Sequence, residues 1–204
     1  MDMTKAFIQD IYLTPNRMAK LTLWKEWLSP LDADRLLSMA IGGIPWREDQ
    51  IQMFGRKIPI PRLQNWFSSD GTSYKYSKLA LSPLILPKWM EGLRKSIEKQ
   101  TNNSFNGILA NYYRDGKDSV GWHADDERSL GFEPVIASLS LGAERSFELK
   151  HKNTKENLNI ILPHGSLLLM SAGIQSYWLH RINKVNGGVE PRINLTFRKV
   201  LFNE

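Results

Sequence analysis

The stretch PRINLTFR, residues 191–198, alternates polar and apolar side chains along its length. Residues two apart on a β-strand project from the same face, so the polar residues at positions 192 to 198 share one side and the apolar ones the other. If Arg192 and Arg198 face a protein interior, they require an anionic ligand, because an unpaired buried charge is very costly. A dicarboxylate fits, since the planar fork of arginine binds a carboxylate through two hydrogen bonds. The alternative is an edge strand whose arginines face solvent.

Short runs of β-type residues separated by Gly, Asn and Pro precede this strand in the second half of the chain. They predict strands over residues 135–141, 147–149, 158–162, 167–171 and 177–182, with the last strand over 192–201. Many short strands at this spacing are typical of a sandwich or jelly roll. The sequence therefore predicts a mainly β fold.

Helical periodicity is confined to the first hundred residues. Pro30 opens a segment with apolar residues at three- and four-residue spacing, which Gly42 and Gly43 end. Pro87 opens a second such segment over residues 88–100. Trp24 and Trp27 fall within a further possible N-terminal helix. We expect these helices to flank the sheets.

Composition narrows the classes of protein. The 204 residues include no cysteine, which excludes disulfide frameworks, thiolate zinc sites and iron–sulfur clusters. The net charge of +6 and the pI near 9.5 favour polyanionic partners. No apolar stretch is long enough to span a bilayer and the N-terminus does not resemble a signal peptide. We expect a single soluble domain, monomeric and cytoplasmic, in a bacterium because no nuclear-type basic tail is present.

A candidate metal site lies in GWHADDE, residues 121–127. In an extended segment, His123 and Asp125 project to the same face, and His180 in a strand-like run could supply a second imidazole. Two histidines and one carboxylate leave coordination positions open, as in non-haem Fe(II) oxygenases. Zinc is the competing metal, but a structural zinc site without cysteine needs four protein ligands and only three can be named.

A basic and aromatic stretch lies between residues 54 and 78 and contributes four of the six net positive charges. Cations suit phosphates, and flat apolar rings suit unstacked bases, so the stretch predicts a nucleic-acid surface. An ordinary exposed hairpin whose aromatic residues belong to the core is the alternative.

Four motifs together, in order and spacing, resemble the AlkB family of Fe(II)/2-oxoglutarate dioxygenases: NYYRDG at 111–116, HADDE at 123–127, His180 and RINLTFR at 192–198. Residues 54–56, 61–62 and 74–77 look like that family's nucleotide-recognition lid, most similar to the homologue that repairs double-stranded DNA. The resemblance covers about residues 50–200 and implies an α+β, mainly β double-stranded β-helix (jelly roll); we expect one such domain over residues 1–204. It comprises an N-terminal helical extension (1–50), the lid (51–82) and the catalytic core (105–204).

The resemblance also implies roles for individual side chains. Fe(II) would be held by His123, Asp125 and His180. The cosubstrate 2-oxoglutarate would be held at its distal carboxylate by Arg192 with Tyr113, at its iron-chelating end by Arg198 with Asn111, and by a pocket that Asn194 supports. With O2, the family oxidises an N-linked methyl group, releasing formaldehyde, succinate and CO2.

The implied substrates are 1-methyladenine and 3-methylcytosine in alkylated DNA, whose positive charge favours an aromatic face beside a carboxylate. Tyr76 would stack on the flipped base opposite the His123 ring. Glu127 or Asp126 would contact its exocyclic edge, and Tyr74 would add a hydrogen bond. Phe54 would fill the gap in the duplex or else pack under the lid, while phosphates would be held by Arg56, Lys57 and Arg62. An RNA or tRNA demethylase and a catalytically silent nucleic-acid-binding protein are the alternatives.

Overall fold

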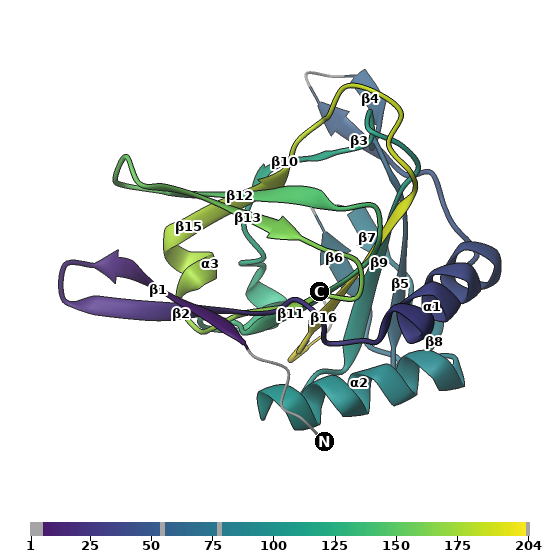
Figure 1. Cartoon of the computed structure of the whole chain (residues 1–204), viewed down its shortest axis with the longest axis horizontal. Helices are drawn as coiled ribbons and strands as arrows, with labels where there is room; N and C mark the ends of the chain where they lie inside the picture. Colours follow the sequence, from purple (N-terminus) through teal and green to yellow (C-terminus); the bar gives the residue numbers. More distant parts are fainter. Residues whose placement is uncertain (1–5, 54–55, 77–78, 203–204) are drawn as a thin grey trace.

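Two β-sheets face each other in the computed structural model, which describes residues 6–53, 56–76 and 79–202 (Figure 1). The larger sheet runs, edge to edge, β1 (Phe7–Thr14), β2 (Arg17–Trp24), β14 (Leu167–Met170), β11 (Ile136–Gly142), β16 (Arg192–Arg198), β9 (Gly107–Tyr113), β5 (Leu63–Ser68) and β8 (Leu84–Ile85). The smaller sheet runs β10 (Val120–His123), β15 (Trp178–Ile182), β12 (Arg145–His151) and β13 (Asn157–Leu162). The predicted mainly β jelly roll is confirmed.

Two helices cover the larger sheet on the side away from the smaller one (Figure 1). These are α1 (Pro30–Gly43), capped by the Ser29 side chain, and α2 (Lys88–Thr101). Their apolar stripes pack in one core cluster with the odd-numbered side chains of β16, from Ile193 to Phe197. Because side chains alternate along a strand, the polar residues of β16 face the space between the sheets. The site therefore lies inside the sandwich.

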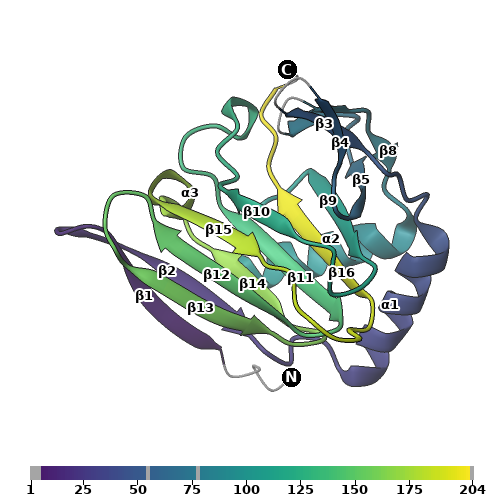
Figure 2. The ribbon, with the colours of Figure 1, turned by 90° about the horizontal axis from the view of Figure 1, so that it is seen from above.

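The first fifty residues are not the helical extension that the sequence analysis predicts. Residues 7–24 form the hairpin β1–β2, which joins the larger sheet where β2 pairs with β14 (Figure 2). In β2, Ala19, Leu21 and Leu23 are buried at alternate positions, a period of two that favours a strand over a helix. Within residues 6–50, only α1 is helical.

The predicted lid, residues 51–82, is not one unit either. It includes the hairpin β3 (Gln50–Met53) with β4 (Arg56–Pro59) and the hairpin β6 (Tyr74–Tyr76) with β7 (Leu79–Leu81). Between them lies β5, which pairs with β9 inside the larger sheet. The basic stretch therefore contains a core strand, and the hairpin β6–β7 also contributes the buried side chains of Tyr74 and Leu81.

Two short helical segments lie next to strands of the smaller sheet along the chain. These are η1 (Arg128–Leu130), after β10, and α3 (Ile174–Tyr177), just before β15. Among the described residues, no helix is both long and apolar enough to cross a membrane.

Candidate active site

Three side chains able to bind a metal converge between the sheets. His123 ends β10, Asp125 follows it by two residues, and His180 lies in the middle of β15. His123 pairs directly with His180 across the two strands, and their ring centroids are 4.3 Å apart. One ligand atom from each of the three residues lies within 4.8 Å of the others. This set can hold one ion on one face and leave its other positions open.

A β-bulge aims His123 into the sandwich. Val120 pairs with Ile182 and His123 pairs with His180, so β10 has one more residue than β15 between these two pairs. In a regular strand, Val120 and His123 would point to opposite faces, but here both line the same pocket. The His123 Nδ1 lies 2.8 Å from the Gly121 carbonyl oxygen, and a proton donated there leaves Nε2 for a metal.

The protonation states of the ligands suit metal binding. Burial alone would raise the pKa of Asp125, but Arg198 and the two imidazoles outweigh it and lower the pKa to about 2. Burial and the neighbouring His123 lower the pKa of His180 to about 3. Asp125 is therefore ionised and His180 neutral at physiological pH, the forms that a metal requires.

Arg198 fixes the Asp125 carboxylate. Its Nη2 donates to Asp125 Oδ1 at 2.7 Å, which leaves the second oxygen for a metal. The Asp125 backbone N–H donates to the side-chain oxygen of Gln175 at 3.0 Å. Both contacts are buried, so water does not compete with them.

Arg192 provides a buried cation with unused donors. Its Nη2 donates to Ser140 Oγ at 2.9 Å and its guanidinium carbon lies 5.2 Å from the centre of the Tyr113 ring. Nε and Nη1 have no hydrogen-bond partner among the residues that the structure describes. Burial lowers the pKa of Arg192 to about 10, so it stays charged at neutral pH. A buried cation with unused N–H groups fits an anionic ligand, as a dicarboxylate would be.

Asn194 and Asn111 have different partners from one another. Asn194 donates to Ser138 Oγ at 2.7 Å and accepts from Thr196, and these hydrogen bonds connect three residues that line the pocket. Asn111 Oδ1 accepts from Arg62 Nε at 2.8 Å, whereas Arg198 donates to Asp125. Both Asn111 and Arg198 line the pocket, which encloses about 470 Å³ of empty space, part of it open to solvent.

Two predicted contacts with nucleic acid are corrected. Arg62 is buried and lines the pocket, where it donates to Asn111 and Gln64 instead of reaching a phosphate. Asp126 points outward, and Lys152 pairs with it at 3.1 Å, so it cannot contact a base in the pocket. In both cases the partner, Asn111 for Arg62 and Lys152 for Asp126, is distant in sequence.

Glu127 lies inward beside the metal ligands. Burial and the Asp125 carboxylate raise its pKa to about 7. Its Oε2 is buried and has no hydrogen-bond partner in the described part of the chain. Tyr74 is buried as well, stacks on Trp66 with ring centroids 4.6 Å apart, and has its pKa raised by burial. Both side chains therefore lie near Arg198 and Asp125.

The remaining predicted residues are at the edge of what the structure describes. Lys57 is exposed on β4. Phe54 lies outside the described residues, and the side chains of Arg56 and Tyr76 are not described although their backbones belong to β4 and β6. Their roles stay predictions.

Sequence reasoning missed several residues of the site. Ser138 and Ser140 contact Asn194 and Arg192, and their alternation within the otherwise apolar β11 was a usable signal. Gln175 and the buried Arg145, which lies over the Tyr113 ring at 5.7 Å, had no local signal. Arg145 also donates to the backbone carbonyl of Asp118, which is distant in sequence.

Comparison with known proteins agrees with this geometry. Residues 20–198 match the family model of the 2OG-Fe(II) oxygenase superfamily. The chain is 38% identical over 205 residues to mouse alpha-ketoglutarate-dependent dioxygenase alkB homolog 3, covering 95% of this chain and 70% of the mouse protein. It is 38% identical over 160 residues to the bovine DNA oxidative demethylase ALKBH2, covering 74% of this chain and 58% of that protein.

Solved structures share the fold at lower identity. The structure of OsALKBH1 superimposes with a TM-score of 0.59 at 16% identity and covers 94% of this chain and all of that one. An oxidoreductase of the 2OG-Fe(II) oxygenase family from Burkholderia pseudomallei has a TM-score of 0.62 at 12% identity, covering 90% of this chain and 86% of that one.

Proposed function

This chain belongs to the AlkB family of the 2OG-Fe(II) oxygenase superfamily, and we propose that it demethylates 1-methyladenine and 3-methylcytosine in DNA. It is an oxidoreductase of a family that uses Fe(II), 2-oxoglutarate and O2. In the proposed reaction, 2-oxoglutarate and O2 give succinate and CO2, and the methyl group leaves as formaldehyde. DNA repair is the process that such a reaction serves.

One observation carries the proposal: the His123, Asp125 and His180 cluster lies in the same pocket as Arg192, whose buried Nε and Nη1 lack a partner among the described residues. The donor set suits Fe(II), and the free guanidinium edge suits a carboxylate of 2-oxoglutarate. When bound, the iron would let O2 act as the oxidant of a C–H bond of the substrate, with 2-oxoglutarate as the second electron donor.

The protein's own residues hold and orient these groups. His123, Asp125 and His180 would ligate the iron, with Arg198 keeping the Asp125 carboxylate in place. Ser140 and Tyr113 hold Arg192 toward the pocket, so that its fork meets a carboxylate without a search through rotamers. Leu109 and Phe147 add apolar surface to the lining of the same pocket.

Glu127 supports a cationic base as the substrate. N-methylation at the ring positions of adenine and cytosine gives the base a positive charge, which a nearby carboxylate attracts. The Glu127 side chain lies beside Asp125 and Arg198, inward of the rim of the site, with one oxygen unpartnered in the described structure. That oxygen would accept a hydrogen bond from the exocyclic amine of the base.

The name of the bovine relative, DNA oxidative demethylase, supports DNA as the nucleic acid that carries the methylated base. The basic hairpin β3–β4, with exposed Lys57, supports a phosphate backbone nearby. An extruded base costs a few kcal/mol to unstack, and the cost is least for lesions that cannot pair.

A formaldehyde-release assay tests this proposal. Purified protein with Fe(II) and 2-oxoglutarate is given 1-methyladenine or 3-methylcytosine in single-stranded DNA, duplex DNA or RNA. We expect formaldehyde from methylated DNA, none from the unmethylated controls, and none from the His123→Ala or Asp125→Ala variants. Release from methylated RNA alone would overturn DNA as the substrate, and release from no methylated polymer would overturn demethylation.

A further inference from the structure

We propose that an exposed patch beside the base pocket binds the single strand that flanks the target base. The patch, here called the rim patch, consists of Arg128, Phe132, Lys199, Leu201 and Phe202. The inference rests on the proposed function, because the strand is the one that carries the methylated base. None of the predicted nucleic-acid contacts lies in it.

Apolar side chains on the rim patch are unusually exposed. Phe132 is 91% exposed, Leu201 59% and Phe202 44%. A phenylalanine ring in full contact with water contributes nothing to the core, and exposed apolar groups that gather in one place mark binding sites. A flat exposed ring is the group on which an unstacked base can stack, whatever its sequence.

The two segments that carry the rim patch are in contact. The backbone N–H of Leu201 donates to the Ser129 carbonyl at 2.8 Å. A Cβ added to Gly131 would lie only 2.5 Å from the Leu201 side chain, so Leu201 fits against the loop where that loop lacks a side chain. Gly131 also has a φ of +79°, which other residues rarely adopt. The loop after η1 and the segment after β16 therefore form one surface.

The charge of the rim patch suits a phosphate backbone. Arg128 and Lys199 are exposed and neither forms an ion pair with any residue of the described ranges. Glu133, the acid next to Phe132, is bonded to Arg17. The two cations are thus available to phosphates, as in single-strand grooves that combine cations with stacking rings.

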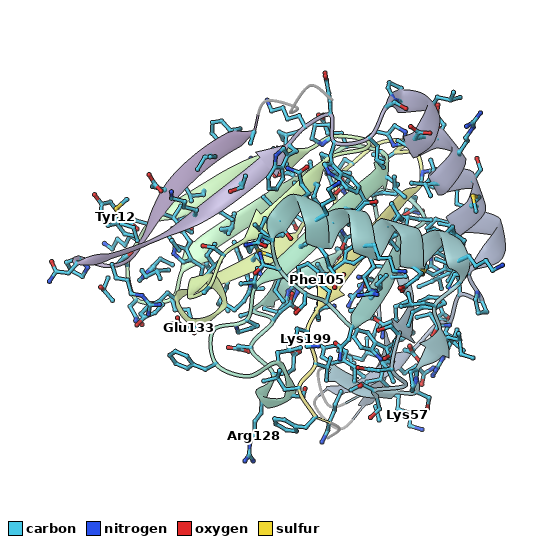
Figure 3. The ribbon with its side chains drawn as sticks, turned by 90° about the horizontal axis from the view of Figure 1, so that it is seen from below. Tyr12, Lys57, Phe105, Arg128, Glu133 and Lys199 are labelled. Carbon is cyan, nitrogen blue, oxygen red and sulfur yellow. The ribbon has the colours of Figure 1, made fainter. Side chains whose placement is uncertain are left out.

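Two residues of the rim patch are the immediate sequence neighbours of residues at the site. Arg128 follows Glu127, whose side chain lies beside Asp125, and Lys199 follows Arg198, which bonds Asp125. Each cation is therefore one residue from a group of the site but outside it. Figure 3 shows Arg128 at the same end of the molecule as Lys57 of β4. A strand that binds to the hairpin β3–β4 can therefore also pass over the rim patch.

Binding to a methylated single-stranded oligonucleotide tests the inference. A fluorescent strand with a central 3-methylcytosine is titrated under nitrogen with protein that carries Fe(II) and 2-oxoglutarate, and anisotropy is followed. Phe132→Ala should weaken binding about ten-fold, the loss of one stacked base. The double variant Arg128→Gln/Lys199→Gln should reduce the slope of log affinity against log salt by about 1.4, two single-strand phosphates.

Matched controls change the same residue types elsewhere. Phe7→Ala removes a 52% exposed ring from the edge strand β1, and Lys88→Gln/Lys99→Gln removes two exposed charges from α2. Both should bind like the wild type. Turnover of a methylated trinucleotide, too short to reach far from the pocket, should be equal in all these proteins.

The outcomes separate the two proposals. If the wild type demethylates nothing, the proposed function fails, while binding of the strand still reports on the rim patch. If the wild type is active and the rim variants bind as tightly as Phe7→Ala, with an unchanged salt slope, the rim patch does not bind the strand. Equal losses in the rim and control variants would overturn the inference as well.

Discussion

The guanidinium group of Arg62 reaches Asn111 inside the sandwich, although the basic stretch around it predicts contact with a phosphate. Because the Asn111 amide oxygen accepts from Arg62, its NH2 group is left to donate to a ligand in the pocket. Arg62 in turn donates to Gln64, whose amide reaches Asp49. Arg62 therefore positions Asn111, and we expect a change at Arg62 to affect the binding of 2-oxoglutarate.

Arg62→Lys should separate these two roles. Lysine keeps the charge but loses the fork that holds Asn111 and Gln64 together. We expect the Kd for 2-oxoglutarate to rise about ten-fold, about 1.4 kcal/mol, with the affinity for single-stranded DNA unchanged. Calorimetric titration of 2-oxoglutarate and anisotropy with an oligonucleotide measure the two. Weaker DNA binding at unchanged 2-oxoglutarate affinity would instead show that Arg62 contacts the phosphate backbone.

At the scale of elements, β9 depends on a glycine where it meets β5. A Cβ on Gly107 would lie 2.0 Å from the end of the Trp66 ring, closer than atoms can approach. Trp66 is fully buried and stacks on Tyr74 of β6, which faces Arg198 at 5.2 Å. The glycine therefore sets where the hairpin β6–β7 meets the site.

Gly107→Ala should lower the free energy of unfolding by about 2 kcal/mol, as overpacking in a core does. It should also reduce demethylation, because Trp66 must shift and carry Tyr74 with it. Urea unfolding and formaldehyde release measure the two effects. As a control, Gly92→Ala on α2 adds a Cβ with nothing within 4 Å and should not destabilise the protein. Equal stability of both variants would contradict this packing.

Asp70 joins the end of β5 to the segment after β16. Partial burial alone would raise its pKa, but hydrogen bonds from Thr72, Ser68 and Asn106 outweigh burial and hold the pKa below its usual range. Asn106 also donates to the Val200 carbonyl at 2.8 Å, so the link reaches the residue between Lys199 and Leu201 of the rim patch. The carboxylate contributes to stability only while it is ionised.

The sign of the pH dependence follows from that lowered pKa. The contribution of Asp70 is present above the unfolded-state pKa and is lost as the pH falls below about 4 toward the folded-state value. Wild type should therefore be more stable than Asp70→Asn at neutral pH, with the difference shrinking in acid. Thermal melts from neutral pH to about pH 3 measure it. A difference that is constant over this range would contradict the role of the charge.

At the scale of the whole molecule, regular apolar spacing made most of the sandwich predictable. Periods of three to four and of two mark α1, α2 and the strands from β11 to β16, because burial on one face repeats with the geometry of the element. The hairpin β1–β2 was missed, since its alternation is short and lies beside a true helix. The prediction of one lid over residues 51–82 was wrong because β5, which lies within the basic stretch, is a core strand.

The site could be predicted only where its residues carry a local pattern. His123 and Asp125 are two residues apart, and Arg192 and Arg198 lie on one face of β16. Arg62 and Asp126 were misplaced because their partners, Asn111 and Lys152, are brought to them by the fold. The exposed ring of Phe132 had no signal at all, because exposure depends on the tertiary structure.

Anaerobic titration of Fe(II) in the presence of 2-oxoglutarate tests the central claim most directly, that three ligands and two arginines form one centre. The visible charge-transfer band should saturate at one iron per chain in the wild type. It should be absent in Asp125→Ala and His180→Ala, whose far-ultraviolet circular dichroism should match the wild type. Saturation of the same band at one iron per chain in His180→Ala would contradict the account.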